Sequence, residues 1–210
     1  MSTGSNISRL LQYRQVLINL NELGFETVFS YSLGKEAGVS AEQVRKDFSQ
    51  FGIKGKKKGG YNINELIFTI NEIFRKDEIQ KVILVGLGNI GNAMIQYKGF
   101  RKNMIQIVAA FDIDPAKYKR KYEIPVYPLE SLQDVVDEMG IKIAILAVPE
   151  REAQQVVTLL VQTGIIGILN FTPAVLKVPS HVMTSNIRIG NALETLIYHT
   201  CFRDIRKINY

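Results

Sequence analysis

A glycine-rich turn that follows directly on a short apolar run is the feature that most constrains how this chain folds. The run, Lys81–Val85, is nearly all apolar, as is typical of a strand buried on both faces of a parallel sheet. Between such a strand and a helix, a first glycine allows the tight bend, a second lets a pyrophosphate approach, and a third lets helix and strand pack closely. The pattern predicts a dinucleotide-binding unit whose phosphate-binding residues are Gly86, Leu87, Gly88, Asn89, Ile90 and Gly91.

An acidic residue at the end of the next apolar run specifies the dinucleotide. Ile105–Phe111 has the composition of a second strand and is followed by Asp112, 21 residues beyond Gly91. An acid at this place hydrogen-bonds the adenosine ribose and repels a 2'-phosphate, so the sequence predicts NAD(H) rather than NADP(H). Asp114 is the neighbouring alternative, and Arg120 with nearby lysines leaves an opening for phosphate recognition.

Two further apolar runs, Ile141–Val148 and Gly167–Phe171, flank a predicted helix over residues 153–163. This alternation predicts an α/β fold with a Rossmann-like, doubly wound parallel sheet. Ligands of such sheets lie at the carboxyl edge of the strands, so the loops that follow both runs are expected to border the nicotinamide. The further cofactor-binding residues predicted on this basis are Val148, Pro149 and Phe171, together with Tyr97 at the end of the helix after the glycine turn, where packing is the alternative role.

The first third of the chain has the pattern of a helix-turn-helix. Apolar spacing predicts a helix over Ser8–Leu23, and Ser32–Ala37 is expected to form a short second helix that begins at a serine cap. Ser40, with Gln43 three residues on, forms a capping box that opens a third helix over residues 41–48. The third helix carries basic residues on its outward side, which is typical of a helix that enters the major groove of DNA.

A basic cluster surrounds this third helix. The chain has 26 Lys and Arg against 20 Asp and Glu, and six basic residues against one acid fall between Arg45 and Lys58. The alternative is a solvated loop and helix face, but residues 51–63 also have the pattern of two short strands around a glycine–lysine tip, the wing of a winged helix. A further helix over residues 61–74 closes the domain. The predicted DNA-binding residues are Ser40, Gln43, Arg45, Lys46, Ser49, Lys54, Lys56, Lys57, Lys58, Gly60 and Tyr61.

Composition excludes several other classes. With 46% hydrophobic and 22% charged residues, the chain has the balance of a folded globular protein. One cysteine and two histidines predict neither a disulfide nor a metal site, and Cys201 is expected to be a buried, inert thiol in a helix. No apolar stretch is long enough to cross a bilayer and the N-terminus lacks a signal-peptide pattern, so a cytoplasmic location is expected.

No catalytic residue can be assigned. His181 and His199 both lie beyond the predicted strands, without a Lys, Tyr or Asp partner in a recognisable catalytic arrangement. About 60 residues after the glycine turn are needed to complete the sheet, which leaves no substrate domain. A cofactor-binding domain joined to a DNA-binding domain, without catalytic groups, predicts a sensor rather than an enzyme.

The chain resembles the Rex family of redox-sensing transcriptional repressors over nearly its whole length. The matching motifs are Ile7–Leu10, Gln43–Gly52, Gly60-Tyr61, Gly86–Gly91, Phe111–Pro115, Val148-Pro149 and Gly167–Phe171. The resemblance implies a homodimer that binds palindromic operator DNA when NAD+ dominates and releases it when NADH binds. It also implies that the last helix, about Asn191–Lys207, is swapped between protomers.

Together, motifs and resemblance divide the chain into three parts. Residues 1–78 are expected to form a winged-helix DNA-binding domain, residues 79–188 a Rossmann-like NAD(H)-binding domain, and residues 189–210 a domain-swapped dimerisation helix. The expected partners are double-stranded operator DNA and a second copy of the chain, with no metal and no membrane.

The chain departs from the family pattern at two positions. Many members have an Arg just after the Tyr of the first helix and an Asp shortly before the C-terminal helix, which with a Tyr like Tyr97 form a contact network that NADH rearranges. The corresponding residues here are Gln15 and Arg188, and Arg14 lies one residue away from the first. This ion pair is therefore absent from the sequence.

Three alternatives remain. The departures at Gln15 and Arg188 permit a DNA-binding regulator whose nucleotide response is lost or altered. A small NAD-dependent oxidoreductase with an accessory basic domain would turn over a substrate and would not retain specific DNA. A purely structural interaction protein would leave the glycine turn and Asp112 unexplained.

Overall fold

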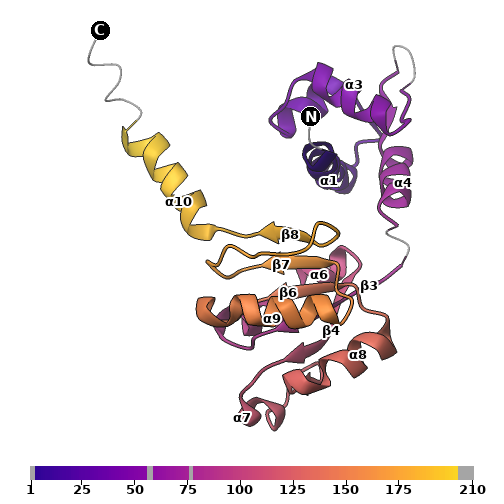
Figure 1. Cartoon of the computed structure of the whole chain (residues 1–210). Coiled ribbons are helices and arrows are strands. Elements are labelled where there is room, and N and C mark those ends of the chain that lie inside the picture. The colour runs from indigo at the N-terminus through magenta and orange to yellow at the C-terminus, as the bar shows by residue number, and fades with distance from the viewer. Residues whose placement is uncertain (1–2, 56–58, 76–77, 203–210) are drawn as a thin grey trace. The chain divides into compact units, whose positions relative to one another are not determined.

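The structure is a computed structural model that describes residues 3–55, 59–75 and 78–202. The chain divides into two compact units, Met1–Glu78 and Ile79–Tyr210 (Figure 1). Among the described helices, none combines the length and apolar character needed to span a membrane.

The N-terminal unit packs four helices and a small sheet around one core. Its buried side chains include Leu10 and Leu17 of the first helix, Val44 and Phe48 of the third, and Ile70 of the last. This spacing of apolar residues at three and four positions buries one face of each helix, as the sequence predicts. The elements are α1 (Thr3–Glu22), β1 (Thr27–Val28), α2 (Ser30–Glu36), α3 (Ala41–Gln50), β2 (Tyr61–Asn62) and α4 (Ile63–Ile73).

The two helix starts of the helix-turn-helix differ in how they are capped. Ser40 caps α3 as predicted, since its side chain accepts a hydrogen bond from the Gln43 N–H at 3.2 Å. The expected serine cap at Ser32 is wrong, because α2 begins two residues earlier. Phe29 is its N-cap residue, and the Phe29 carbonyl accepts the first helical hydrogen bond, from Leu33 N–H, without any side-chain cap.

Of the two wing strands predicted over residues 51–63, the described residues contain one, β2, and its partner is β1. β2 pairs in antiparallel fashion with β1, with Thr27 opposite Asn62 and Val28 opposite Tyr61. The chain after α3 forms no strand over the described residues 51–55, because Ile53 turns back onto the helix. Its N–H donates to the Phe48 carbonyl at 2.9 Å.

The C-terminal unit is built on one six-stranded parallel sheet in the order β5-β4-β3-β6-β7-β8 (Figure 1). The predicted doubly wound parallel fold is confirmed. Its strands are β3 (Gln80–Val85), β4 (Ile105–Phe111), β5 (Val126–Tyr127), β6 (Ile143–Leu146), β7 (Gly167–Asn170) and β8 (Met183–Asn186). Its helices are α5 (Asn89–Gln96), α6 (Gly99–Lys102), α7 (Pro115–Tyr118), α8 (Leu132–Met139) and α9 (Glu150–Gln162), with a 3-10 turn at Leu129–Ser131.

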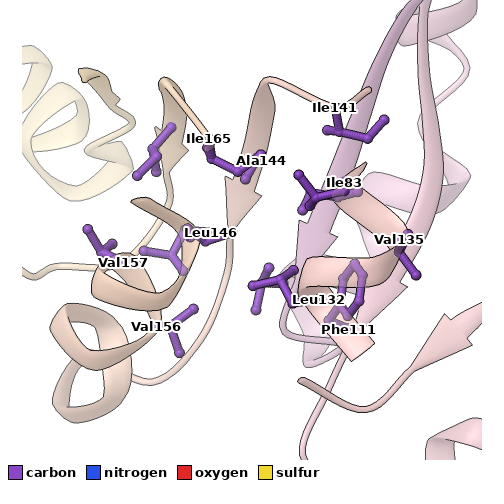
Figure 2. Packing of buried hydrophobic residues seen from close by; sticks show 14 of the residues in the cluster. Ile83, Phe111, Leu132, Val135, Ile141, Ala144, Leu146, Val156, Val157 and Ile165 are labelled. Carbon is purple, nitrogen blue, oxygen red and sulfur yellow. The ribbon is translucent and has the colours of Figure 1, made fainter. Parts of the chain in front are cut away.

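Successive residues of the central strands face opposite sides of the sheet, and each side has its own core. Ile83 and Val85 pack with α8 and α9 on one face, as Figure 2 shows for Ile83 and its neighbours. Val82 and Leu84 belong to a second cluster that includes Met94 and Phe100 on the other face. Helices on both faces explain why the central strands are apolar along most of their length.

The C-terminal helix is not covered by its own chain. α10 spans Ile189–Ile197 and continues as a single π-helical turn, Tyr198–Phe202. Every residue from Ile189 to Cys201 is exposed. The expectation of a buried Cys201 is therefore wrong for the single chain, because no element of the described chain buries this helix.

Candidate nucleotide-binding and DNA-binding sites

The turn between β3 and α5 depends on two of its three glycines for its shape. Gly86 has a φ of +97°, and a Cβ built on it would lie 2.5 Å from the Ala147 carbonyl oxygen. A Cβ on Gly91 would lie 2.0 Å from the Gly86 oxygen. Around Gly88, the N-cap residue of α5, there is no atom within 4 Å of a built Cβ. The fold thus requires Gly86 and Gly91, while Gly88 leaves open space at the helix N-terminus.

A cavity of about 700 Å³ opens beside this turn, within the size range of cofactor sites. It is enclosed by the carboxyl ends of β3, β4 and β6 and by one side of α9. This is the edge at which open α/β sheets bind ligands. Of the predicted cofactor residues, those that line the cavity are Gly86, Gly88, Asn89, Ile90, Asp112, Val148 and Pro149.

Asp112 reaches the cavity as a fixed, ionised carboxylate. It is 8% exposed, and its Oδ2 accepts hydrogen bonds from Leu87 N–H at 2.6 Å and from Lys117 Nζ at 2.8 Å. Its Oδ1 accepts the Asp114 N–H at 3.0 Å. Burial alone would raise the pKa of Asp112, but the bonds from Lys117 and the two amides outweigh burial and hold that pKa below its ordinary value. An anionic acceptor therefore faces the cavity at neutral pH.

The neighbours of Asp112 have other roles. Asp114 also lines the cavity, but its Oδ1 is already engaged as the cap of α7, accepting from Ala116 N–H at 3.0 Å. The Arg120 guanidinium lies over the Tyr122 ring, 5.5 Å from its centroid. Sequence reasoning missed that Lys117, also a cavity residue, pairs with Asp112. The sequence does contain a signal for this pair, because Lys117 lies five residues after Asp112, on the short helix that Asp114 caps.

Four predicted cofactor residues lie behind or beside the cavity rather than in its lining. Leu87 is buried and contributes its N–H to Asp112, and Gly91 packs under the turn. The Tyr97 ring is exposed and meets Phe100 edge-on at 5.0 Å. Phe171 packs in the same apolar cluster as Leu87, and its N–H donates to the Leu146 carbonyl at 2.9 Å.

In the N-terminal unit, a buried carboxylate that sequence reasoning missed anchors α3. Asp47 is 0% exposed, and its Oδ2 accepts from Arg9 Nε at 2.6 Å and from the Tyr13 hydroxyl at 2.8 Å. Its Oδ1 accepts from Gln43 Nε2 at 2.8 Å. Burial alone would raise the pKa of Asp47, but the hydrogen bonds from these three partners hold it below its ordinary value. Gln43, which the sequence predicts to contact DNA, is half-buried, and its amide is engaged by Asp47.

The other predicted DNA-binding residues divide into exposed and supporting groups. Arg45 is exposed and donates to Ser30 Oγ and to Glu42 Oε1, both at 2.9 Å. Lys46, Ser49 and Lys54 are also exposed. Ser40 is the helix cap, Gly60 has a φ of +68° beneath the Phe29 ring, and the Tyr61 ring packs edge-on against Phe48 at 5.1 Å. Lys56, Lys57 and Lys58 lie outside the described residues.

Comparisons with known proteins assign both units. A family model described as a CoA binding domain matches residues 77–174, and one described as a putative DNA-binding protein N-terminus matches residues 4–49. The chain is 41% identical over 191 residues to the redox-sensing transcriptional repressor Rex of Listeria welshimeri, covering 90% of this chain and 89% of that protein. It is 42% identical to the Rex repressor of Anoxybacillus flavithermus, with 90% of each chain covered. The chain belongs to the Rex family.

Solved structures agree with this assignment. The crystal structure of RSP, a Rex-family repressor, has a TM-score of 0.89 at 32% identity and covers 99% of this chain and 98% of its own. RSP in complex with β-NAD+ and operator DNA has a TM-score of 0.90, covering 99% and 96%. The predicted family resemblance is confirmed. Since Rex proteins are transcriptional repressors, the chain is not an enzyme and the oxidoreductase alternative is set aside.

The two departures from the Rex pattern have defined surroundings. Gln15 is exposed and donates to Asn19 Oδ1 at 3.1 Å. Arg14 is 8% exposed and donates from Nε to Asn71 Oδ1 at 2.6 Å, so it points inward and does not replace an arginine at position 15. Arg188, the N-cap residue of α10, donates to main-chain carbonyls of the loop after β7.

Among the described residues, no group of three or more His, Cys, Asp or Glu side chains is arranged to hold a metal ion.

Proposed function

We propose that this Rex-family repressor binds palindromic operator DNA as a homodimer and is released from it when NADH occupies the cavity beside the glycine turn. The observation that carries the proposal is an ionised Asp112 at the edge of that cavity, opposite open space at the N-terminus of α5. RSP, the related repressor, has been solved with β-NADH as well as with β-NAD+ and operator DNA. A repressor works on DNA, so we also propose a cytoplasmic location.

The residues at the cavity fit a dinucleotide. The open space at Gly88 lets phosphates approach the amides of Asn89 and Ile90 at the start of α5, where the helix dipole favours negative charge. Asp112 Oδ1 accepts one hydrogen bond, from the Asp114 N–H, and retains capacity for a ribose hydroxyl. Val148 and Pro149 give the apolar wall that a flat ring needs. When bound, the nicotinamide supplies the redox state that the repressor reads.

The exposed side of α3 fits the major groove. We propose that Arg45, Lys46 and Ser49 contact DNA from α3 and that Lys54 contacts a neighbouring phosphate. Asp47 and Ser40 fix the position of the helix that carries them. The wing lysines at positions 56–58 are proposed DNA contacts on the strength of their sequence alone.

An exposed apolar face of α10 supports the homodimer. Ile189, Leu193, Leu196 and Ile197 fall on one side of the helix, and Ile189 and Leu193 are 68% and 56% exposed. A contiguous apolar face of this kind is costly in water and is typical of a subunit interface. We propose that α10 packs against the partner protomer, in agreement with the swapped helix that the sequence predicts.

Replacing Leu193 by Glu is therefore expected to dissociate the dimer. Each buried leucine side chain contributes about 1.5–3 kcal/mol, so losing two per dimer raises the dissociation constant by at least about 100-fold. Sedimentation velocity measures the change. Asn191→Glu adds the same charge on the opposite side of α10 and serves as the control. A Leu193→Glu chain that stays dimeric contradicts this interface.

The proposed function is tested by fluorescence anisotropy on a palindromic duplex with A/T-rich flanks. The full chain is titrated at fixed salt, and NADH, NAD+ and NADPH are then added in parallel. NADH is expected to release the duplex at concentrations at which NAD+ and NADPH do not. Tight binding that is indifferent to all three nucleotides would support a DNA-binding regulator whose nucleotide response is lost or altered.

A further inference from the structure

Two main-chain carbonyls hold the guanidinium of Arg188 at the carboxyl edge of the sheet. It donates from Nη2 to the Ala174 carbonyl at 2.9 Å and from Nη1 to the Thr172 carbonyl. The loop it holds is itself well ordered by contacts, since the buried Asn170 accepts from the N–H and hydroxyl of Thr172 at 2.9 and 2.8 Å. The positive charge therefore has a defined place beside the end of β7.

That place is next to the nucleotide cavity. β7 pairs with β6 in parallel, with Asn170 beside Leu146, and adjacent strands lie about 4.8 Å apart. The residues that follow β6, from Ala147 to Pro149, line the cavity, and the residues that follow β7 continue at the same edge (Figure 1). The Arg188 guanidinium therefore lies on the order of 10 Å from the cavity wall, two strands away at most.

Within the part of the chain that the structure describes, Arg188 forms no ion pair with a carboxylate. Arg188 is half-buried, and its two partners are neutral carbonyls rather than acids. Glu150 and Glu152, which begin α9 at this edge, are exposed, and Glu152 pairs with Arg151 at 3.1 Å. A half-buried charge is screened less by salt than exposed ones are.

The nicotinamide ring is cationic in NAD+ and neutral in NADH, so a fixed cation nearby opposes only the oxidised form. We propose that Arg188 is a specificity-determining residue that strengthens the preference of the cavity for NADH over NAD+ by electrostatic repulsion of the oxidised ring. The inference rests on the proposed function, since it requires a nicotinamide at this edge. Two unit charges about 10 Å apart, at an effective dielectric constant of about 20–40, change a binding constant about four- to fifteenfold.

Two substitutions of Arg188 separate charge from loop support. Isothermal titration of the full chain with NAD+ and with NADH gives the ratio of the NAD+ dissociation constant to the NADH dissociation constant. Arg188→Met removes the charge and is expected to lower this ratio about four- to fifteenfold, chiefly by tightening NAD+. Arg188→Lys keeps the charge, loses the bidentate fork, and is expected to leave the ratio within about twofold of the original.

The outcomes distinguish this inference from the proposed function. An unchanged ratio in Arg188→Met, or equal losses for both nucleotides in the Met and Lys variants, would show that Arg188 only supports the loop and would overturn the inference. If Arg188→Met does not fold, Arg188→Gln removes the charge and can still donate to one carbonyl. Failure of the unsubstituted chain to bind either dinucleotide would instead overturn the proposed function, and the inference with it.

Discussion

Replacing Gly88 by alanine is expected to abolish dinucleotide binding while leaving the fold intact. A Cβ at this position meets no protein atom within 4 Å, and its φ of −71° suits any residue. The added methyl group would occupy the space through which a pyrophosphate approaches the amides at the start of α5. Losing that approach is expected to weaken NADH binding on the order of 100-fold, about 2.7 kcal/mol.

Isothermal titration with NADH and thermal unfolding of the same sample measure both parts of this result. Gly91→Ala is expected both to lose NADH binding and to lower the unfolding temperature, because its Cβ would lie 2.0 Å from the Gly86 oxygen and force the turn apart. Gly140→Asn serves as the control, since Gly140 ends α8 with a φ of +65° that asparagine tolerates and no atom lies near its Cβ. If Gly88→Ala binds NADH like the unsubstituted chain, the phosphates do not pass over the glycine turn.

The sheet could be predicted from the sequence wherever burial is complete. β3 and β4 are apolar along nearly their whole length because helices cover both faces of the sheet, and that run is visible without tertiary information. β8 was missed because it is an edge strand of the mixed sequence Met-Thr-Ser-Asn, which is mostly exposed. Its pairing with β7, and not its composition, makes it a strand.

The candidate sites could be predicted only where a motif is local. The glycine turn and Asp112 occupy a standard spacing, whereas Asp47 and Arg9 are 38 residues apart in sequence and meet only in the folded unit. By composition alone, Asp47 counts as one acid that offsets the basic cluster. The structure shows instead that it is a buried acceptor that binds the amide of Gln43.

Replacing Asp47 by alanine is expected to destabilise the helix-turn-helix unit by about 3 kcal/mol. Asp47 is fully buried and the Arg9 side chain is only 20% exposed, so removing the carboxylate takes away the charged partner of Arg9, which keeps its hydrogen bond to Asn6 Oδ1. The Tyr13 hydroxyl loses the carboxylate oxygen to which it donates. Hydrogen exchange of the α3 amides in the full chain measures the free energy of opening directly. Operator affinity is expected to fall with it, while NADH binding stays unchanged because the nucleotide cavity lies in the other unit.

The pH dependence of the same variant identifies the charge as the cause. Because the pKa of Asp47 is held below its ordinary value in the folded unit, its contribution to the free energy of unfolding is complete above the unfolded pKa of about 3.9. That contribution is lost as the pH falls through the lower, folded pKa, so the difference between Asp47→Ala and the unsubstituted chain should shrink below about pH 4. Glu42→Ala removes an exposed acid from the same helix and should show a much smaller effect at neutral pH. If the α3 amides of Asp47→Ala stay protected from hydrogen exchange, apolar packing of Val44 and Phe48 alone holds α3 in place.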